Sequence, residues 1–520
     1  MNPITAPTFE WLQLAPVLVV LVAGCLGILV EALVPRRWRF LSQVVLFEIG
    51  IGIAFVLLVL SWVQPKNSVG LMAMGSISLD GPSYLMWGAL LVFGLLSLLV
   101  FAERDLNNGA TSFAASAASV PGSPAEAEAI AARHEHTEVF PLALLSLSGM
   151  MVFVAANDLL TAFVALEVMS LPLYLLSGMA RRRRLLSQEA ALKYFLLGAL
   201  SSAFFLFGVA LVYGFAGSFD LARISDAIAD PVYGRGLLYT GMTFIAIGLL
   251  FKIGAVPFHN WVPDVYVGAP TPVTGFMAIC TKLAAVGATV RVLFVAFGAE
   301  RWSWQPLLAT VAVITMAIGV VVALTQTDMK RLLAYSSISH AGFILVAAVG
   351  ATAGVTGQVN SFGSILFYLV AYGFATVAAF AIVTMVRNQT GEVHEIAGWA
   401  GLGRKNPLLA GIFAVLMLSF AGIPLTGGFI GKWAVFSAAW RGGYSWLVVA
   451  AVALSLVAAY VYLRVIVLMF FAEPAEGVSV GRASGMTWVP VALGALASAY
   501  LGLFPGPLLD LVTSASTFLR

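Results

Sequence analysis

The stretch FKIGAVPFHNWVPDVYVGAPTPVTGFMAICTK, residues 251–282, decides how the chain folds. It places Lys252 in an apolar run just before Pro257, and a second apolar run carries Lys282. Between the lysines lies a polar and aromatic segment with prolines at 257, 263, 270 and 272. Because proline removes a backbone hydrogen bond and interrupts a helix, the pattern predicts a helix that breaks here.

The composition of the chain indicates the environment of this break. Of the 520 residues, 61% are hydrophobic and 10% are charged, and the mean hydropathy is +0.99. This balance excludes the soluble globular classes and predicts an all-α polytopic membrane protein. In a bilayer, non-helical backbone is tolerated only inside protein or beside a water-filled cavity. The break beside a lysine therefore predicts an ion site rather than a lipid-facing span, because freed carbonyls can stabilise an ammonium.

Several classes of function find no support in the residues. The net charge of +3 is too small to indicate a nucleic-acid partner. Cys25 and Cys280 stand alone in apolar runs, so they predict neither a disulfide framework nor a thiolate metal cluster. No GxGxxG or Walker motif is present, and His259 and His340 make no good haem pair. We therefore expect no cofactor in this chain.

Apolar segments of about 18–30 residues, the length that a membrane helix needs, recur along the chain. We count fourteen, and only Asn157 and Asp158 separate the fourth from the fifth. The first lacks a basic region before it and a cleavage site after it, so we expect a retained span. The segments are 12–34, 41–63, 79–102, 139–156, 158–178, 188–215, 237–258, 271–297, 305–325, 333–350, 362–386, 407–440, 444–471 and 487–513.

Lysine and arginine in the connecting loops predict the orientation, because cytoplasmic loops carry an excess of them. If both termini lie on the outer side, fifteen basic residues fall in cytoplasmic loops and six fall outside. The cytoplasmic set is Arg36, Arg37, Arg39, Arg104, Arg133, Arg181, Arg182, Arg183, Arg184, Lys330, Arg331, Arg387, Arg404, Lys405 and Arg482, and the outer set is Lys66, Arg223, Arg235, Arg301, Arg441 and Arg520. We therefore expect both termini on the outer, periplasmic side.

Residues 103–138 differ from the rest of the chain, because they contain AASAASVPGSPAEAEAIAARHEHTE. Such a composition buries too little apolar area to order itself and predicts a flexible cytoplasmic insertion. A role in docking a partner remains the alternative. His134 and His136 are a weak indication of a metal site, since they lie in a loop expected to be mobile.

Five ionisable residues lie deep within the expected spans: Glu167, Lys193, Lys252, Lys282 and Lys432. Each central charge costs about 2.5–3.5 kcal/mol on insertion scales, so five are expected only with pairing, hydration or use. A purely structural salt bridge is the alternative for Glu167 and Lys193. Since burial disfavours the charged form of a lysine and a nearby carboxylate favours it, a row of lysines with one movable ion pair is suited to a proton relay.

Other polar residues in the spans have two readings each. His340 lies among serines in an apolar run and is either a satisfied core histidine or a link in the relay. His259, in VPFHNW, is either a relay entrance or a polar cap. Arg291 and Arg464 lie nearer helix ends, and we expect them to snorkel and be structural.

A faint repeat follows in the second half of the chain. AGIPLTGGFIGKW, residues 421–433, has its break at Pro424 before Lys432, whereas Lys252 comes before the break at Pro257. A reversed order of lysine and break is what two broken helices in an inverted-topology repeat would show.

These motifs resemble those of the antiporter-like membrane subunits of proton-pumping NADH–quinone oxidoreductase, respiratory complex I, most closely the subunit N branch. FKIGAVPFHNWVPDVYVGAPTPV (251–273), TDMKRLLAYSSISHAGF (327–343) and GIPLTGGFIGKW (422–433) carry the resemblance, which covers the whole set of spans. It implies two inverted five-helix repeats, 139–297 and 305–471, each with a broken helix. They would follow a three-helix segment (1–102) and the insertion (103–138), and precede a C-terminal helix (487–513).

The resemblance also implies roles for the buried charges. Glu167 and Lys193 match the family's ion pair, and Lys252 matches the central lysine of the first half-channel. Lys282 matches the connecting lysine, and Lys432 the residue of the second half-channel. The M branch carries a glutamate where this chain has Lys432, and the L branch extends into a long lateral helix.

The implied function is proton translocation coupled to quinone reduction elsewhere in a complex. NADH, FMN, iron–sulfur clusters and quinone would then belong to other subunits or interfaces. Partners would be the other membrane subunits in a bacterial-type plasma membrane. A subunit of a multi-subunit cation/proton antiporter of the Mrp type is the alternative, since it shares the fold. A membrane enzyme with its own redox centre is a further alternative, against which the missing ligand clusters argue.

Overall fold

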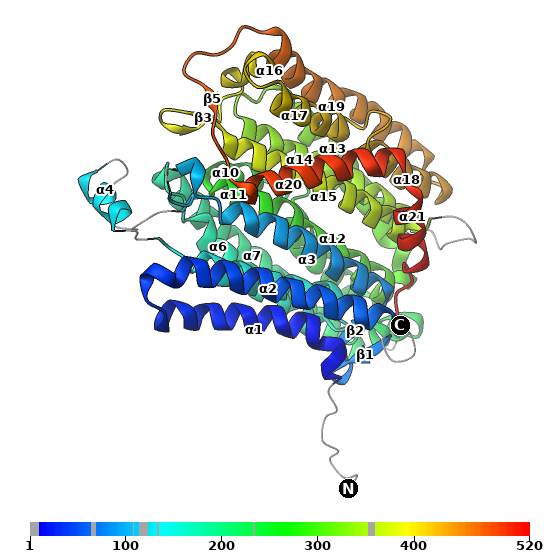
Figure 1. Cartoon of the computed structure of the whole chain (residues 1–520). Coiled ribbons are helices and arrows are strands. Elements are labelled where there is room, and N and C mark those ends of the chain that lie inside the picture. Colours follow the sequence, from blue (N-terminus) through cyan, green and yellow to red (C-terminus); the bar gives the residue numbers. More distant parts are fainter. Residues whose placement is uncertain are drawn as a thin grey trace.

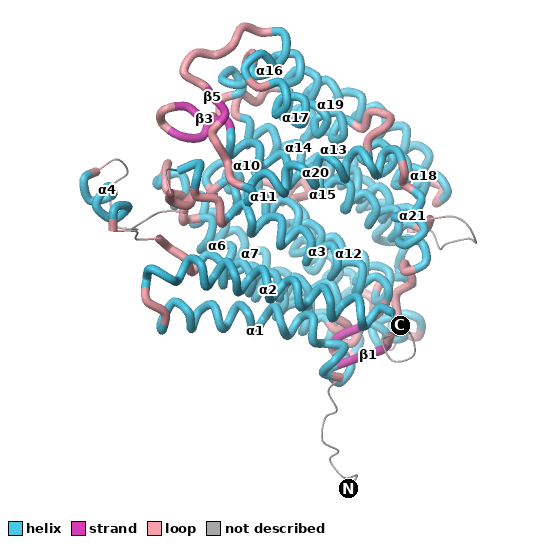
Figure 2. The backbone as a smooth tube through the Cα atoms, in the orientation of Figure 1, coloured by secondary structure: helices cyan, strands magenta, loops and turns pink. Residues whose placement is uncertain are grey.

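The computed structural model describes residues 10–63, 69–107, 109–113, 123–132, 135–231, 234–351 and 359–519. Within them helices dominate, and the strands are short pieces at the two ends of the bundle (Figure 2). The helices are α1 (Trp11–Leu33), α2 (Arg36–Val63), α3 (Gly81–Phe101), α4 (Pro124–Ala131), α5 (Val139–Ala155), α6 (Leu159–Ser177), α7 (Arg184–Ala216), α8 (Leu221–Ala229), α9 (Gly236–Ile253), α10 (Trp261–Gly268), α11 (Thr271–Phe276), α12 (Lys282–Arg291), α13 (Arg301–Leu324), α14 (Met329–Gly350), α15 (Ser361–Met385), α16 (Leu402–Lys405), α17 (Pro407–Ala421), α18 (Gly427–Arg441), α19 (Ser445–Phe471), α20 (Gly485–Leu503) and α21 (Gly506–Ser514).

The strands form two small sheets. β1 (Gly70–Met72) pairs antiparallel with β2 (Ile77–Leu79). β3 (Val386–Asn388) lies between β4 (Gly391–Glu392) and β5 (Ser479–Val480), and both pairings are antiparallel. These hairpins only connect helices, so the prediction of an all-α membrane protein is confirmed.

The expected membrane spans agree with the helices. Twelve described helical stretches are long and apolar enough to cross a membrane, and α5 and α17 are shorter apolar helices. The fourth and fifth expected segments are separate, because Asp158 ends the link and accepts a hydrogen bond from Thr161 N at 2.6 Å as the N-cap of α6. The twelfth expected segment, 407–440, is two helices, α17 and α18, with Pro424 between them.

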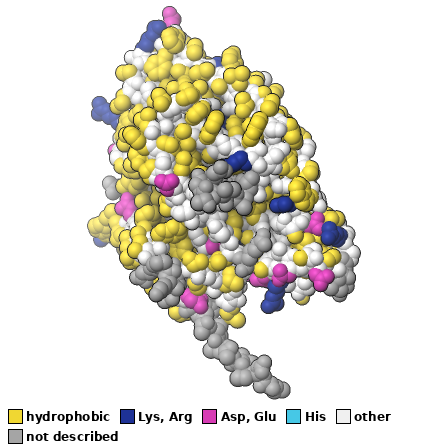
Figure 3. Space-filling view, turned by 90° about the vertical axis from the view of Figure 1, so that its right-hand side faces the viewer, with side chains coloured by type: hydrophobic (Ala, Val, Ile, Leu, Met, Phe, Trp, Pro, Cys, Tyr) yellow, Lys and Arg dark blue, Asp and Glu magenta, His cyan; other side chains and the backbone are white. Residues whose placement is uncertain are grey.

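The helices run side by side between two ends of the bundle (Figure 1). The start of α1 and the C-terminal α21 lie at the end that carries β1 and β2, and β3 with the α1–α2 turn lies at the other. Seen from the end that carries α21, charged side chains are few, scattered and of both signs (Figure 3). Because the start of α1 and α21 lie at the same end, the chain crosses the bundle an even number of times.

The centre of the bundle is made by two long helices and one stretch with two wide turns. In the most apolar window of α14 and α15, 94% and 89% of the residues are buried, against 39% for α1, α2, α7 and α19. The stretch Thr271–Ala296 is equally enclosed, and its segments Met277–Thr281 and Val292–Ala296 are π-helical. Wide turns of this kind often accompany functional sites.

Helices α13 and α14 approach closely through glycine. A Cβ added to Gly319 would lie 2.6 Å from Ser339 N, and one added to Gly342 would lie 2.8 Å from Met316 N. Small residues permit such approach between membrane helices, where packing replaces the hydrophobic effect as the driving force. The glycines thereby hold α14, which carries His340, at a fixed distance from α13.

Arg291 corrects one expectation, because it does not snorkel. Its guanidinium is 1% exposed and binds both carboxylate oxygens of Asp80, at 2.9 and 2.7 Å. Asp80 also accepts from Leu519 N at 3.1 Å, so this ion pair ties α3, α12 and the C-terminal segment together. Arg464 caps another helix instead, since it donates to Leu324 O at 2.7 Å and to Gln326 O at 2.9 Å.

The expected flexible insertion, 103–138, begins with packed residues. Phe113 is 2% exposed and lies with its ring 5.2 Å from that of Phe101. Glu103 is buried and accepts from Ser484 Oγ and Thr487 Oγ1 at 2.8 and 2.7 Å. Composition did not indicate this, because single aromatic and acidic residues found partners on distant helices. Residues 108, 114–122 and 133–134, including His134, lie outside the described part of the chain.

Candidate functional site

The first helix break stands where the sequence predicts it. α9 ends at Ile253, Gly254 takes a left-handed conformation with φ 80°, and the Val256–Pro257 bond is cis. The freed backbone groups find partners, since Trp261 Nε1 donates to Phe251 O at 2.9 Å and Val256 N donates to Thr315 Oγ1 at 3.0 Å. The break is thus enclosed by protein, which is the condition for non-helical backbone in a bilayer.

Lys252 is held by hydroxyls rather than by the carbonyls that the break was expected to free. Its Nζ donates to Ser170 Oγ at 2.8 Å and to Tyr174 Oη at 3.3 Å, and it lies 5.5 Å from the centre of the Tyr194 ring. The residue is 3% exposed. The carbonyl of Phe251 accepts from Trp261, and the partners of Lys252 are hydroxyls of α6.

Glu167 and Lys193 do not form the ion pair that the resemblance implies. Lys193 Nζ lies 2.7 Å from Asp264 Oδ2 and 2.6 Å from Glu189 Oε1, and its side chain is 42% exposed. Glu167 Oε1 is buried and has no hydrogen-bond partner among the described residues. The physical reason is proximity: Glu189 lies one turn earlier on α7, and α10 packs directly against α7.

Lys282 begins α12 directly after the first π-helical segment. Its ammonium donates to both Ser337 O and Ser337 Oγ, and it lies 5.4 Å from the centre of the Tyr372 ring. Lys252 and Lys282 both line a cavity of about 10 Å³, together with Trp261, Tyr266 and Ser337. A volume of about 10–15 Å³ holds a single water, so the cavity has the size of one bridging molecule.

His340 lies one turn after Ser337 on α14, in a ring of aromatic side chains. Its Nδ1 lies 2.5 Å from Tyr368 Oη and its Nε2 lies 3.2 Å from Tyr462 Oη. The ring is 4.6 Å from that of Tyr372, which also covers Lys282. Both ring nitrogens have hydroxyl partners, so His340 is satisfied in the core and at the same time adjoins the surroundings of Lys282.

The second helix break holds its lysine directly. Lys432 Nζ donates to Phe420 O at 3.1 Å and to Ala421 O at 2.8 Å, the last carbonyls of α17 before Pro424. A third bond reaches Ser455 Oγ on α19 at 2.8 Å. The C-terminal end of a helix carries partial negative charge, which stabilises an ammonium. The ring of Phe420 also lies 5.7 Å from that of His340.

These contacts place four basic residues in order across the middle of the bundle. Lys252 shares a cavity with Lys282, Lys282 shares the Tyr372 ring with His340, and Phe420 lies between His340 and Lys432. The connecting groups are hydroxyls, aromatic rings and backbone carbonyls. Of these groups only the hydroxyls can both accept and donate a proton, so transfer between lysines that never touch requires a hydroxyl or a water in each gap.

His259 stays apart from this row. It lies in the turn between α9 and α10, and its Nδ1 is buried and has no hydrogen-bond partner in the described chain. No described hydrogen bond joins its ring to Lys252 or Lys282. Among the described residues, no group of three His, Cys, Asp or Glu side chains is placed to hold a metal ion.

The neutral and acidic partners of the lysines were not predicted from the sequence. Asp264 stood in the opening stretch as the one acidic residue of the broken helix, and that was a usable signal. The hydroxyls of Ser170, Tyr174 and Ser337 gave no such signal, because serine and tyrosine are common in apolar helices. Their contacts cross between helices, which hydropathy does not register.

A protein-family model matches 318 residues of the chain, 156–473. The family is described as "NADH:quinone oxidoreductase/Mrp antiporter, TM". This range includes Glu167, Lys193, Lys252, Lys282, Lys432 and both helix breaks. It leaves the helices α1 to α5 and α20 to α21 outside the match.

Relatives extend the similarity to nearly the whole chain. It is 52% identical to NADH-quinone oxidoreductase subunit N of Nocardioides sp. over 99% of each protein. A chain of respiratory complex I from Thermus thermophilus with bound Aureothin is 32% identical, with a TM-score of 0.76 over 96% of this chain and 100% of that one. A chain of the Mrp complex from Dietzia sp. DQ12-45-1b has a TM-score of 0.79 over 97% of each chain. At 23% identity, that likeness concerns the fold alone. The chain belongs to the transmembrane family of NADH:quinone oxidoreductase and Mrp antiporter subunits.

Proposed function

We propose that this chain is the subunit N of a proton-translocating NADH-quinone oxidoreductase and carries protons across the membrane. The observation that carries the proposal is the row Lys252, Lys282, His340 and Lys432, buried at mid-bundle in a chain that is 52% identical to a protein of that name. Buried lysines this close in series have no evident structural purpose. Ionisable residues that face the interior of a membrane bundle typically mark a proton or ion pathway.

The relay would pass a proton from one lysine to the next by way of hydroxyls and water. An ammonium has three donors, and the neutral amine has two donors and one lone pair. When Lys252 releases its proton, Tyr174 Oη can turn from acceptor to donor and keep the amine bonded. The protein therefore need not rearrange its backbone at each transfer.

Lys193 would act as the movable charge of the relay. It is bound to Asp264 and Glu189, while Glu167 stands half-buried one turn before Ser170, the partner of Lys252. A swing of Lys193 from Asp264 toward Glu167 would withdraw a negative influence from Lys252 and favour loss of its proton. The ion pair of the family is then one of two positions of this lysine.

The same proposal implies a membrane, an orientation and neighbouring subunits for the chain. We place it in a bacterial plasma membrane with both termini on the outer side, which puts the fifteen basic loop residues in the cytoplasm. NADH, FMN, iron–sulfur clusters and quinone would be bound by other subunits or at their interfaces. The energy of quinone reduction would thus reach this chain only through its neighbours in the membrane.

The proposal is tested by isolating the chain from its native membrane under mild detergent and identifying the proteins that co-purify. Subunits of an NADH-quinone oxidoreductase, with NADH-dependent proton uptake lost when Lys252 is replaced, are the expected result. Co-purification with cation/proton antiporter subunits instead would establish the Mrp alternative, to which the chain is similar in fold.

A further inference from the structure

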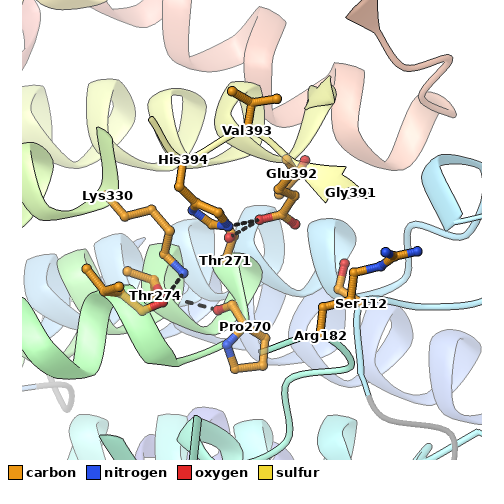
Figure 4. A network of polar contacts seen from close by, with 12 residues as sticks. Ser112, Arg182, Pro270, Thr271, Thr274, Lys330, Gly391, Glu392, Val393 and His394 are labelled. Atoms are coloured by element: carbon orange, nitrogen blue, oxygen red, sulfur yellow. Dashed lines mark hydrogen bonds and ion pairs between the residues drawn. The ribbon is translucent and has the colours of Figure 1, made fainter. Parts of the chain in front are cut away.

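A basic pocket opens at the end of the bundle that carries β3, away from the row of buried lysines. Its volume is about 410 Å³. Five parts of the chain line it: the loop that holds Asn107 and Ser112, the loop before α7, the α10–α11 junction, the start of α14 and the β3–β4 hairpin with the residues that follow it (Figure 4). The cationic lining residues are Arg181, Arg182, Arg183, Lys330 and Arg387.

Three of these cations are bound to neutral oxygens only, in the contacts that the structure describes. Arg182 donates to Thr390 O. Arg387 donates to Asn107 Oδ1 at 2.7 Å and to Thr384 O at 3.3 Å, and Lys330 donates to Ala269 O at 2.7 Å. Neutral acceptors fix the positions of the guanidinium and ammonium groups but do not neutralise their charge.

One carboxylate, Glu392, faces these five cations inside the pocket. Its Oε2 accepts from Thr271 Oγ1 at 2.5 Å and lies 3.9 Å from His394 Nε2, as Figure 4 shows. The His394 side chain is 10% exposed, and its Nδ1 is buried without a hydrogen-bond partner in the described structure. A pocket with an excess of cationic donors and an unused histidine nitrogen has unmet capacity for an anion.

Burial and the neighbouring cations lower the pKa values of two pocket residues that lie outside the membrane helices, Arg387 and His394. Burial first, and then the guanidiniums of Arg182 and Arg181, lower the pKa of Arg387 in spite of Glu392. Burial, Lys330 and Arg183 lower the pKa of His394 well below its ordinary value. Both groups therefore sit in a positive local field that an anion would relieve.

We propose that this pocket binds a phosphate group. Guanidinium forks match phosphate oxygens in geometry and charge, and several of them converge here from separate elements. The phosphate belongs either to the headgroup of an anionic phospholipid or to a free phosphate ion, since both present the same oxygens. The pocket opens at one end of a membrane bundle, where headgroups lie.

Occupation would tie the two halves of the chain together. Arg181, Arg182 and Arg183 belong to the first expected repeat, whereas Lys330, Arg387 and Glu392 belong to the second. Direct links between these sides are the bonds from Arg182 to the Thr390 carbonyl, from Thr271 to Glu392 and from Lys330 to the Ala269 carbonyl. A phosphate bound by both sets would strengthen this junction at the start of α14, the helix that carries His340.

The test measures ligand binding to the purified full chain by native mass spectrometry. The probes are dioleoyl phosphatidylglycerol, inorganic phosphate and uncharged dioleoylglycerol. Replacing Arg182 and Arg183 by Gln should weaken binding of the phosphate-bearing probe about 30-fold, since a cation near a membrane surface contributes roughly fivefold to the affinity for an anionic lipid. The matched control, Arg36→Gln with Arg37→Gln, removes two exposed arginines outside the pocket and should leave binding unchanged.

A second variant guards against simple misfolding. Glu392→Gln removes the one carboxylate of the pocket and keeps an oxygen for Thr271, so it should bind the phosphate-bearing probe several-fold more tightly. Pocket-dependent binding of phosphatidylglycerol alone identifies a lipid headgroup, and pocket-dependent binding of inorganic phosphate identifies the free ion. Equal affinities for pocket variants and control, or equal binding of dioleoylglycerol, overturn the proposal.

Discussion

Lys193 Nζ lies 2.7 Å from Asp264 Oδ2, so the lysine of α7 is bound to the second half of the broken helix whose first half carries Lys252. The other oxygen of the same carboxylate, Oδ1, accepts from Arg331 Nη2 of α14 at 3.3 Å. Asp264 therefore connects the break, α7 and the central helix through one side chain. Movement of Lys193 away from Asp264 must therefore break the contact between α7 and α10.

Asp264→Asn should lower proton translocation about tenfold in the assembled complex, because Lys193 loses one of its two charged positions. The carboxylate is 32% exposed, so its loss should leave the amount of complex unchanged. NADH-driven proton uptake by membrane vesicles, normalised to the chain content, measures the effect. Glu189→Gln is the matched control, since it removes the other carboxylate of Lys193 without touching α10 or α14. Equal losses in both variants would contradict a special role for Asp264.

Lys252→Ala and Lys252→Arg should both nearly abolish translocation while the fold is retained. Arg keeps the charge but is effectively never deprotonated, so it cannot take part in a relay. The measurement is proton uptake in membranes that hold equal amounts of each assembled variant. Lys405→Arg, at a surface lysine that binds backbone carbonyls, should pump normally. Near-normal pumping by Lys252→Arg would leave Lys252 as a fixed charge only.

Asp80→Asn should destabilise the chain by about 3–5 kcal/mol, because it leaves the Arg291 guanidinium buried without its carboxylate. Both partners are 1% exposed, so no solvent replaces the lost ion pair. Chain content in the membrane and resistance to protease report the loss. Arg301→Gln changes an exposed cation near the same helix ends and should have little effect. If Asp80→Asn accumulates normally but fails to pump, the pair serves the mechanism and not the fold.

Cysteine labelling tests the proposed orientation. In a Cys25→Ser background, Arg183→Cys should be protected from a membrane-impermeant maleimide added outside sealed cells, and Asp230→Cys should react. Both positions are exposed, so accessibility depends only on the side of the membrane. Cys280 is buried and should contribute no background signal. Reaction at position 183 from outside would reverse the assigned sides.

The pair His136 and Glu138 should make the loop before α5 sensitive to pH. The hydrogen bond from His136 to Glu138, 2.5 Å long, raises the pKa of His136 above 6.5. Burial opposes it, but the same bond lowers the pKa of Glu138. The stabilising contribution of His136 is therefore full below its unfolded pKa and is lost as the pH rises through the folded value.

Titration of the histidine by NMR measures this shift. Glu138→Gln should return the pKa of His136 toward 6.5, because the carboxylate that favours the charged ring is gone. Glu128→Gln, an exposed change of the same charge in α4, should leave the titration as it is. An unshifted His136 in the unaltered chain would contradict the bond.

Fold and breaks could be predicted because both depend on local chemistry. Apolar length located the spans, proline located the breaks at Pro257 and Pro424, and the cost of a buried charge singled out Lys252, Lys282 and Lys432. The predicted boundaries lie within a few residues of the observed ones. For example, the predicted segment 237–258 corresponds to α9, Gly236–Ile253.

The features that the sequence did not predict depend on contacts between helices. The partner of Lys193 could not be predicted, because Glu167 and Asp264 both carry a carboxylate. Only the packing of α10 on α7 decides which of them lies beside the lysine. The burial of Arg291 required Asp80, which stands 211 residues earlier. The pocket around Lys330 likewise combines five separate segments, none of which is unusual by itself.

The different partners of Lys252 and Lys432 make the two halves of the chain unequal. Hydroxyls are amphoteric, so the Ser170 and Tyr174 partners of Lys252 can bind either form of the amine. Two of the three partners of Lys432 are carbonyls, which accept and never donate. When Lys432 gives up a proton, Ser455 is therefore the one of these partners that can turn and donate to the neutral amine. At the first break two hydroxyls can make this change, and at the second break only one can.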